Sequence, residues 1–317
     1  MKILLIGGCG YAGSVLTGRL LERGDDVTVV DAEWFGNFLK PHTRLKTVKM
    51  DVRETGRLPL EGMDAVINLA NVANDVCVLL DPLLSWEVNV LAVMQLAEHC
   101  VRLGVPRMLH ASSGSVYGLS DAERVTEDTE LKPISVYNET KMVAERVLLS
   151  YAGDFNLQII RPGTICGLSP RMRFDLVVNM FTLQALQNGI ITVFDERQVR
   201  PAIHVDDMAE VYLFMLDHPE HQGTFNAAFQ NVTLGEIAQA VTKHVPSEVK
   251  KSKADDPRSY RMCSDKLLGL GFKPRKGIDD AVRAIVEASR AGTLKDEDHC
   301  YNIRWMKQHP PHSAQRS

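Results

Sequence analysis

Short apolar runs alternate with longer amphipathic segments along the first half of the chain. The runs are continuous, which is typical of strands buried on both faces of a parallel sheet. We expect these strands at 2–6, 27–30, 45–50, 65–69, 107–110 and 157–160. Helical periodicity marks the segments 11–23, 83–103 and 136–151. Strands that alternate with helices in this way predict an α/β protein with a doubly wound parallel sheet.

The alternation loosens after about residue 161, where helical segments with short strands predict a second lobe. The stretch from residue 299 is polar and contains Pro310 and Pro311. Because few apolar side chains are available there to pack, we expect this end of the chain to be frayed.

Length and charge narrow the class of protein. The 317 residues suffice for one large domain or two unequal lobes, and the net charge of -4 argues against broad nucleic-acid binding. No apolar run is long enough to cross a bilayer, and the chain opens directly on a strand pattern, so we expect a cytoplasmic protein without a signal peptide. The six cysteines are scattered without a Cys-x-x-Cys pair, which predicts free thiols and no metal site.

A glycine-rich turn, Gly7-x-x-Gly10-x-x-Gly13, follows the first strand and opens the first helix. Glycines there allow a tight turn and close backbone approach, and the N–H groups of the helix start attract a diphosphate. Asp31 at the end of the second strand can accept hydrogen bonds from a ribose diol and repel a 2′-phosphate, which favours NAD over NADP. The cofactor-binding residues predicted in this region are Gly7, Gly10, Tyr11, Ala12, Gly13 and Asp31.

Two further strand ends are candidates for cofactor contact. Asp51 and Val52 follow the third strand and can reach the adenine, although a solvated loop Asp is nearly as good an interpretation. Leu69 and Ala70 end the fourth strand, where their backbone would line the inner half of the dinucleotide.

Tyr137 and Lys141 are four residues apart in a helical segment, so both side chains project from one face. A cation beside a phenol favours the phenolate and lowers the pKa of the phenol. A hydroxyl from Ser113 can hold the oxygen that the phenol deprotonates. Beside a hydride acceptor, these three residues are suited to oxidising an alcohol.

Together these motifs resemble the extended short-chain dehydrogenase/reductase family, in its nucleotide-sugar epimerase/dehydratase branch, whose members have a Rossmann fold. The resemblance covers about residues 2–274 and adds Val116-Tyr117-Gly118, Arg161-Pro162-Gly163 and Arg200-Pro201-Ala202-Ile203-His204 to the motifs above. It implies an NAD-binding domain over 1–165 with a return segment near 195–225. The smaller mixed α/β substrate lobe would span 166–194 and 226–298.

The resemblance also implies roles for individual residues. Tyr137 would be the acid/base, Lys141 would hold the nicotinamide ribose and lower the pKa of Tyr137, and Ser113 would bond the reacting hydroxyl. The predicted contacts to the diphosphate of a nucleotide sugar are Asn179, Arg200 and Arg258, for which a helix-interior Asn and surface arginines are the alternatives. The family further implies a homodimer built from the helices at 83–103 and 136–151.

Gly114 and Ser115, the two residues after Ser113, bear on the reaction. Relatives that eliminate water or decarboxylate carry a carboxylate there, and relatives that epimerise at C3 and C5 carry a Cys. Small, hard-to-ionise residues favour chemistry at a single carbinol, which predicts a 4-epimerase. A 4-ketoreductase or 4-dehydrogenase is the alternative, and the intact Ser113, Tyr137 and Lys141 argue against a non-catalytic NAD-binding module.

Two departures from the pattern of sugar 4-epimerases concern the substrate pocket. Thr164 stands where many of them carry Asn, and the segment 167–175 is unlike theirs. In that segment Arg171 or Arg173 is a candidate contact for an anionic substrate group, and the alternative is that both only flank a helix.

Overall fold

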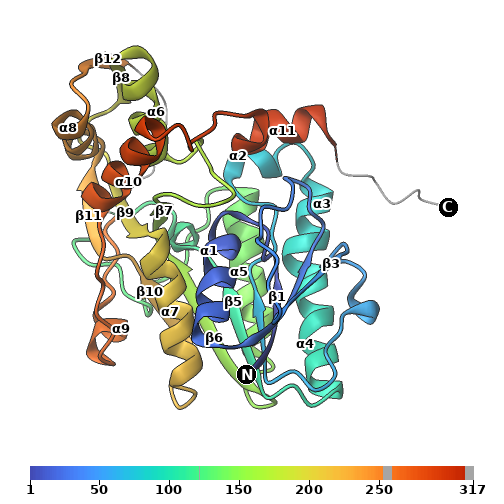
Figure 1. Ribbon diagram of the computed structural model, residues 1–317. Helices are drawn as coiled ribbons and strands as arrows, with labels where there is room; N and C mark the ends of the chain where they lie inside the picture. The colour runs from blue at the N-terminus through green and yellow to red at the C-terminus, as the bar shows by residue number, and fades with distance from the viewer. Residues whose placement is uncertain (121, 253–258, 311–317) are drawn as a thin grey trace.

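A seven-stranded, wholly parallel sheet forms the centre of the protein in the computed structural model, which describes residues 1–120, 122–252 and 259–310 (Figure 1). Its strand order is β10-β6-β5-β4-β1-β2-β3. The strands are β1 (Lys2–Ile6), β2 (Asp26–Asp31), β3 (Leu45–Lys49), β4 (Ala65–Asn68), β5 (Arg107–Ala111), β6 (Asn156–Pro162) and β10 (Gly223–Ala227). The order reverses between β1 and β4, which defines the switch point where doubly wound sheets bind ligands.

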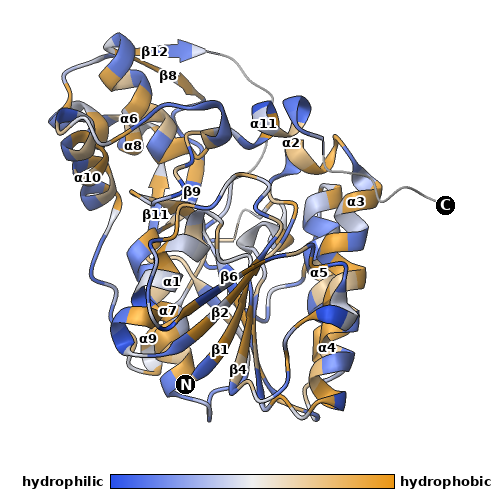
Figure 2. Ribbon diagram, turned by 45° about the vertical axis from the view of Figure 1, so that its right-hand side comes forward, coloured by the Kyte–Doolittle hydropathy of each residue, from blue (hydrophilic) through white to orange (hydrophobic). Residues whose placement is uncertain are grey.

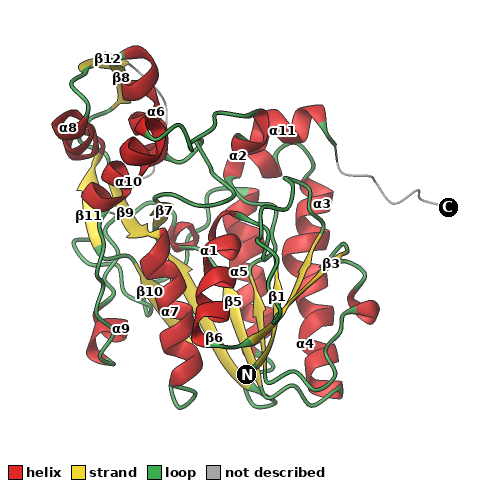
Figure 3. Ribbon diagram, in the orientation of Figure 1, coloured by secondary structure: helices red, strands yellow, loops and turns green. Residues whose placement is uncertain are grey.

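Helices cover both faces of this sheet, as the layers in Figure 3 show. One face packs on α1 (Tyr11–Arg23) and α7 (Val205–Asp217). The other packs on α4 (Ala92–Arg102) and α5 (Val136–Leu149). The central strand β1 is apolar from Ile3 to Ile6 (Figure 2), because neighbouring residues such as Leu4 and Leu5 enter the cores on opposite faces of the sheet.

Two expected elements differ from the prediction. Strand β3 is an edge strand whose side chains are half-buried or exposed, so the expectation of a buried strand there was wrong. The expected helix over 83–103 is present as one uninterrupted helical segment, but the π-helical turn η2 (Glu87–Leu91) lies within it, between α3 (Pro82–Trp86) and α4. Inside η2, the buried Asn89 bonds the backbone of Val72, which anchors the wide turn to the loop after β4.

A smaller lobe lies above the carboxyl ends of the strands (Figure 1). It contains the three-stranded sheet β11-β9-β7 and the parallel pair β12-β8 around a separate apolar core. Its strands are β7 (Thr164–Cys166), β8 (Ile190–Phe194), β9 (Val199–His204), β11 (Gln230–Thr233) and β12 (Glu248–Ser252). Its main helices are α6 (Val177–Asn188), α8 (Leu234–His244) and α10 (Ile278–Arg290).

The remaining helical segments are short, and two of them form the C-terminal end of the described chain. They are η1 (Thr55–Arg57), α2 (Asp75–Val78), η3 (Gly114–Tyr117), α9 (Asp265–Gly269), η4 (Asp298–Cys300) and α11 (Asn302–Gln308). The expectation of a frayed end from residue 299 was therefore wrong as far as Gln308, because η4 and α11 are ordered helical turns packed on the protein. Within the residues described, no helix has the length and apolar character needed to cross a membrane.

Candidate active site

A cavity of about 1800 Å³ opens at the carboxyl ends of the central strands and extends into the smaller lobe. Of the predicted site residues, the structure brings together in its lining Gly7, Gly10, Tyr11, Ala12, Gly13, Asp31, Asp51, Val52, Leu69, Ala70, Ser113, Tyr137 and Arg200. This position, beside the switch point between β1 and β4, is where open α/β sheets bind dinucleotides.

The glycine-rich turn forms a cradle that leaves no room for side chains. Gly7 has a φ of +83°, and a Cβ on it would lie 2.6 Å from the Ala70 backbone nitrogen. A Cβ on Gly13 would lie 2.2 Å from the Gly7 carbonyl oxygen. Helix α1 begins at Tyr11 without a side-chain cap, so its first N–H groups remain available to an anion.

Asp31 closes the cradle on the side of β2. Its carboxylate accepts hydrogen bonds from the backbone N–H groups of Cys9 (2.9 Å) and Glu33 (2.8 Å). Burial raises the pKa of Asp31, and these two hydrogen bonds act against that rise. Each carboxylate oxygen keeps a second lone pair, so a ribose diol can still donate to it.

Two further predicted cofactor residues, Tyr11 and Asp51, are held in place by side-chain contacts. The Tyr11 hydroxyl donates to the Gly167 carbonyl (2.6 Å), which ties the start of α1 to the loop after β7. The Asp51 carboxylate forms an ion pair with the Arg53 guanidinium, which also pairs with Glu87. The negative charge of Asp51 is therefore balanced by Arg53 beside the cavity. This pairing lowers the pKa of Asp51.

Tyr137 lies in the first turn of α5, and its side chain is hydrogen-bonded to that of Ser113. Burial raises the pKa of Tyr137 to about 12, while the Ser113 hydrogen bond and the charge of Arg173 act to lower it. Arg173 is thus a cation that acts on the phenol, which the sequence had not indicated, and the role of Lys141 in lowering the pKa of Tyr137 stays a prediction. Ser113 is placed by its own turn, since its hydroxyl caps η3 and contacts the Ser115 hydroxyl at 2.8 Å.

Lys141 lies one helical turn beyond Tyr137 and is only 1% exposed. Its ammonium donates to the Ala111 carbonyl oxygen (2.8 Å), at the end of β5. Burial lowers the pKa of Lys141 to about 7, and the neighbouring Glu145 opposes this effect. One of the ammonium protons is thus used by the protein, and Lys141 lies behind the residues that line the cavity without belonging to the lining itself.

The three predicted substrate contacts have different outcomes. Arg200 lines the cavity and is oriented by the Gln198 side chain (2.8 Å). The structure does not bring Asn179 into the cavity: it is fully buried, and its amide bonds Gly167, Tyr11 and Arg173. Its polar atoms are thus engaged in holding the loop after β7, which a helix-interior position alone does not reveal. Arg258 lies outside the described residues.

Sequence reasoning missed how the segment 171–175 is arranged. Arg173 forms a two-point ion pair with Asp175 (2.8 and 3.0 Å) and lines the cavity near Tyr137. Arg171 faces the Asp31 side of the cavity, where its guanidinium lies 4.2 Å from the centre of the Phe35 ring. In the sequence, only the Arg-x-Arg-x-Asp spacing pointed to this segment. That spacing does not tell whether the two arginines face the cofactor or the substrate.

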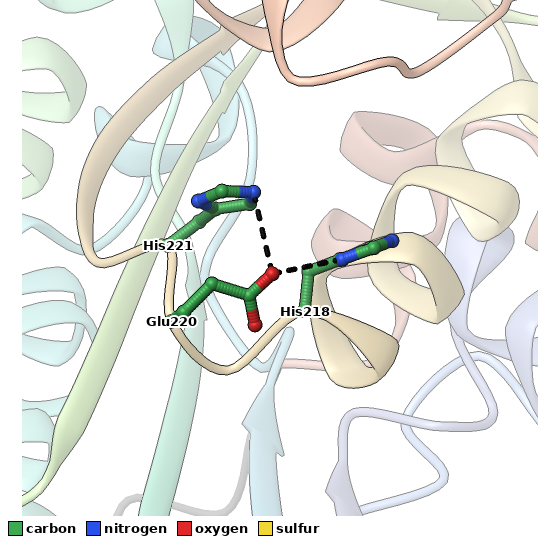
Figure 4. A group of neighbouring side chains, drawn as sticks. All are labelled: His218, Glu220 and His221. Carbon is green, nitrogen blue, oxygen red and sulfur yellow. Dashed lines mark hydrogen bonds and ion pairs between the residues drawn. The ribbon is translucent and has the colours of Figure 1, made fainter.

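The sequence predicted no metal site, but one group of side chains in the described part of the chain is close enough together to hold a metal ion. His218, Glu220 and His221 follow α7 with their ligand atoms within 4.8 Å of one another (Figure 4). Both imidazoles point at one oxygen of Glu220, at 3.0 and 3.5 Å. The three residues do not belong to the cavity lining, and the contacts that Glu220 makes with both imidazoles account for their arrangement.

Comparison with known proteins agrees with this geometry. Residues 3–228 match the NAD dependent epimerase/dehydratase family. The chain is 27% identical to a UDP-glucose 4-epimerase of Lactobacillus helveticus, over 89% of this chain and 95% of the relative. It is also 27% identical to UDP-glucuronic acid decarboxylase 1 of Arabidopsis thaliana, over 94% of this chain and 72% of the relative. The crystal structure of Thermus thermophilus UDP-glucose 4-epimerase in complex with NAD superposes with a TM-score of 0.81 at 26% identity, covering 92% of this chain and 99% of that one.

The protein belongs to the NAD dependent epimerase/dehydratase family, since the family match covers more than two thirds of the chain. It is therefore an enzyme of the nucleotide-sugar branch that uses NAD, as the sequence predicted. The cradle of Gly7 and Gly13, with the carboxylate of Asp31 beside it, fits the diphosphate and ribose of this cofactor.

Proposed function

We propose that this enzyme is a nucleotide-sugar 4-epimerase. The observation that carries the proposal is the pair of residues after Ser113. Gly114 has no side chain to ionise, and a Cβ added there would lie 2.3 Å from the Met262 sulfur, so a larger residue would require the Met262 side chain to move. Ser115 is occupied by its contact with Ser113. Removal of water or of a carboxylate would require a further acid or base besides Tyr137. Neither of these two positions supplies one.

The proposed substrate is a sugar joined to a nucleoside diphosphate. Arg200 supplies a guanidinium at the smaller-lobe end of the cavity, and a guanidinium suits the bidentate binding of phosphate. The cavity is large enough for a dinucleotide and a sugar nucleotide together. We assign the cofactor to residues 1–165 with the return segment at 195–225, and the substrate to 166–194 and 226–298.

In this proposal Tyr137 manages the proton of the sugar 4-hydroxyl. Its phenolate oxygen takes that proton as the C4–H bond breaks, and returns it when the hydroxyl re-forms in either configuration. Ser113 hydrogen-bonds the same sugar oxygen and holds it beside the phenol. Lys141 would hold the nicotinamide ribose with the protons that Ala111 does not use. NAD, when bound, supplies the hydride acceptor and donor.

A 4-ketoreductase or 4-dehydrogenase would use the same three side chains in one direction only. The two candidates differ in whether reduced cofactor accumulates, because an epimerase returns the hydride within each turnover. They share one prediction, that no carbon-bound proton exchanges with water.

The test is to incubate the purified holoenzyme with a panel of nucleotide sugars in heavy water. For each sugar, the product is identified by NMR and the redox state of the bound nicotinamide by its absorbance. A 4-epimer without net NADH and without deuterium on carbon supports the proposal. Stoichiometric NADH indicates a dehydrogenase instead. Deuterium at C3 or C5 indicates that a carbon-bound proton has been removed there. That result would contradict the proposal, because neither residue after Ser113 can act as the base.

We also propose that the enzyme is a homodimer formed through α3, α4 and α5. Large apolar side chains remain exposed along the first two helices and the turn between them, among them Leu83, Trp86, Leu91 and Met94. Exposed apolar patches of this kind mark surfaces that associate. Light scattering at micromolar concentration should give a dimer for the wild type and a monomer for Met94→Glu, and a monomeric wild type would contradict the proposal.

A further inference from the structure

The segment 299–310 lies across the part of the cavity where Asp31 is placed, although a frayed end was expected there. Asn302, His309 and Pro310 belong to the cavity lining, as do Trp34 and Phe35 from the loop after β2. In Figure 1, α11 lies beside α2 at the carboxyl-end edge of the central sheet. We propose that this segment, the C-terminal latch, holds NAD in its groove between turnovers, with Arg171 as the buried cation that faces the cofactor.

Two tryptophans fasten the latch to the loop after β2. The Trp305 indole donates to the Trp34 carbonyl oxygen (2.5 Å), and the Trp34 indole donates to the His309 carbonyl oxygen (2.7 Å). The Trp305 ring stacks on His309 with centroids 3.8 Å apart. Phe38 stacks on His299 at 4.8 Å, which adds a second aromatic contact between the same two segments.

The latch is also joined to the segment 171–175 from the other side of the groove. The Phe174 N–H donates to the Cys300 carbonyl (2.9 Å), and the Asn302 N–H donates to Asp175 (3.3 Å). The Arg171 guanidinium donates to the Asn302 side chain (2.6 Å) and to the His299 carbonyl (3.2 Å). The latch thus connects two walls of the cavity that the central sheet does not hold together.

Arg171 is the observation that directs the proposal to a ligand. It is 2% exposed, it lines the cavity, and its Nε has no hydrogen-bond partner among the described residues. Its hydrogen-bond acceptors are neutral oxygens of the latch, and no carboxylate of the described chain lies within ion-pair distance. Asp31 and Asp175 act on Arg171 only from beyond that distance. A buried cation without a direct ion pair is costly, so an anion at this point of the cavity would stabilise it. NAD carries a diphosphate and would bring such an anion into the cavity that Arg171, Gly10 and Gly13 line together.

A dinucleotide beneath the latch leaves the groove only after these contacts open. The expected consequence is slow release of NAD, with the latch contacts contributing to the barrier to dissociation and not to the chemistry. This inference rests on NAD as the cofactor and is independent of the 4-epimerase reaction.

The experiment measures NAD release from the full-length holoenzyme in the absence of any sugar nucleotide. The enzyme is loaded with isotopically labelled NAD, chased with unlabelled NAD, and the retained label is followed over time. Trp305→Ala and Arg171→Gln should release NAD about tenfold faster or more, the equivalent of about 1.4 kcal/mol of lost interaction. Arg304→Ala is the matched control, because Arg304 is on the same helix but exposed.

Wild-type release rates in both Trp305→Ala and Arg171→Gln would overturn the proposal, as would an equal acceleration in Arg304→Ala. Thermal melting of each variant establishes that it is folded. If Trp305→Ala does not fold, Trp305→Phe keeps an aromatic ring at this position and removes the N–H that donates to Trp34, together with part of the ring volume. It should then accelerate release by a smaller factor, and an unchanged rate in it and in Arg171→Gln would equally overturn the proposal. Because no sugar is present, failure of the proposed epimerase reaction leaves this result unaffected.

Discussion

Glu145 on α5 and Arg161 on β6 form a two-point ion pair, with nitrogen–oxygen distances of 2.6 and 2.9 Å, that is closed to solvent. Glu145 also accepts a hydrogen bond from the Ser112 hydroxyl, next to Ser113. It lies one helical turn after Lys141, which itself lies one turn after Tyr137. The pair therefore fixes the helix face that carries the acid/base against the strand behind it.

Glu145→Gln should strongly destabilise the protein, because it leaves the Arg161 guanidinium buried without its counter-ion. Removing one partner of a buried ion pair costs about 3–5 kcal/mol. Urea denaturation should report a loss of about that size in the free energy of unfolding. Glu139→Gln, on the exposed face of the same helix, is the control, and equal stability of the two variants would contradict the assignment.

Tyr137→Phe should lower turnover by a factor of about 10²–10⁴, the usual contribution of a positioned general acid/base. The variant should retain NAD, because the ring and the helix remain in place. Turnover is measured on the sugar nucleotide that the panel identifies, and NAD content after gel filtration. Undiminished turnover would remove Tyr137 from the acid/base role.

Gly13→Ala should abolish tight NAD binding, because its Cβ would lie 2.2 Å from the Gly7 carbonyl oxygen. Gly18 is on the same helix, and a Cβ added to it would meet nothing within 4 Å, so Gly18→Ala is a matched control. It should bind NAD normally and gain about 0.5–1 kcal/mol of stability from helix propensity. Calorimetric titration with NAD compares the two, and tight binding by Gly13→Ala would refute the cradle.

Asp31→Ala should weaken the preference for NAD over NADP, because it removes the negative charge that opposes a 2′-phosphate. The dissociation constants of the two dinucleotides are measured on wild type and variant. An unchanged ratio would place the source of cofactor specificity elsewhere in the cavity.

Lys141→Met should change how stability depends on pH. Burial lowers the pKa of Lys141 to about 7, below its value of about 10.4 in an unfolded chain. Between these values the unfolded chain binds more protons, so this group makes wild-type stability rise with pH, by up to about 1.4 kcal/mol per pH unit. Urea denaturation at several pH values above 7 should show a smaller rise in the variant, whose turnover should also fall. Identical pH profiles would mean that Lys141 is not a buried cation.

The local patterns of the chain were sufficient for much of the fold and for the centre of the site. Apolar runs located five buried strands of the central sheet, because a strand buried on both faces needs apolar residues at most positions. They also located the edge strand β3, although the prediction that it is buried was wrong. The glycine spacing located the cradle, and helical periodicity placed Tyr137 and Lys141 on one face of α5. In each case the residues that act together are neighbours in the sequence.

The features that only the tertiary structure shows are contacts between residues that are far apart in the chain. The strand β10 joins β6 at the sheet edge, Asn179 turns toward Tyr11, and Arg161 meets Glu145. The polar C-terminal stretch is ordered because Trp305 contacts Trp34, 271 positions earlier, and Arg171 contacts Asn302. No local period encodes such pairings, because the partner that satisfies a polar group or covers an apolar one is chosen only when the chain has folded. The sequence determined which chemistry the site can carry, and packing determined which residues enclose it.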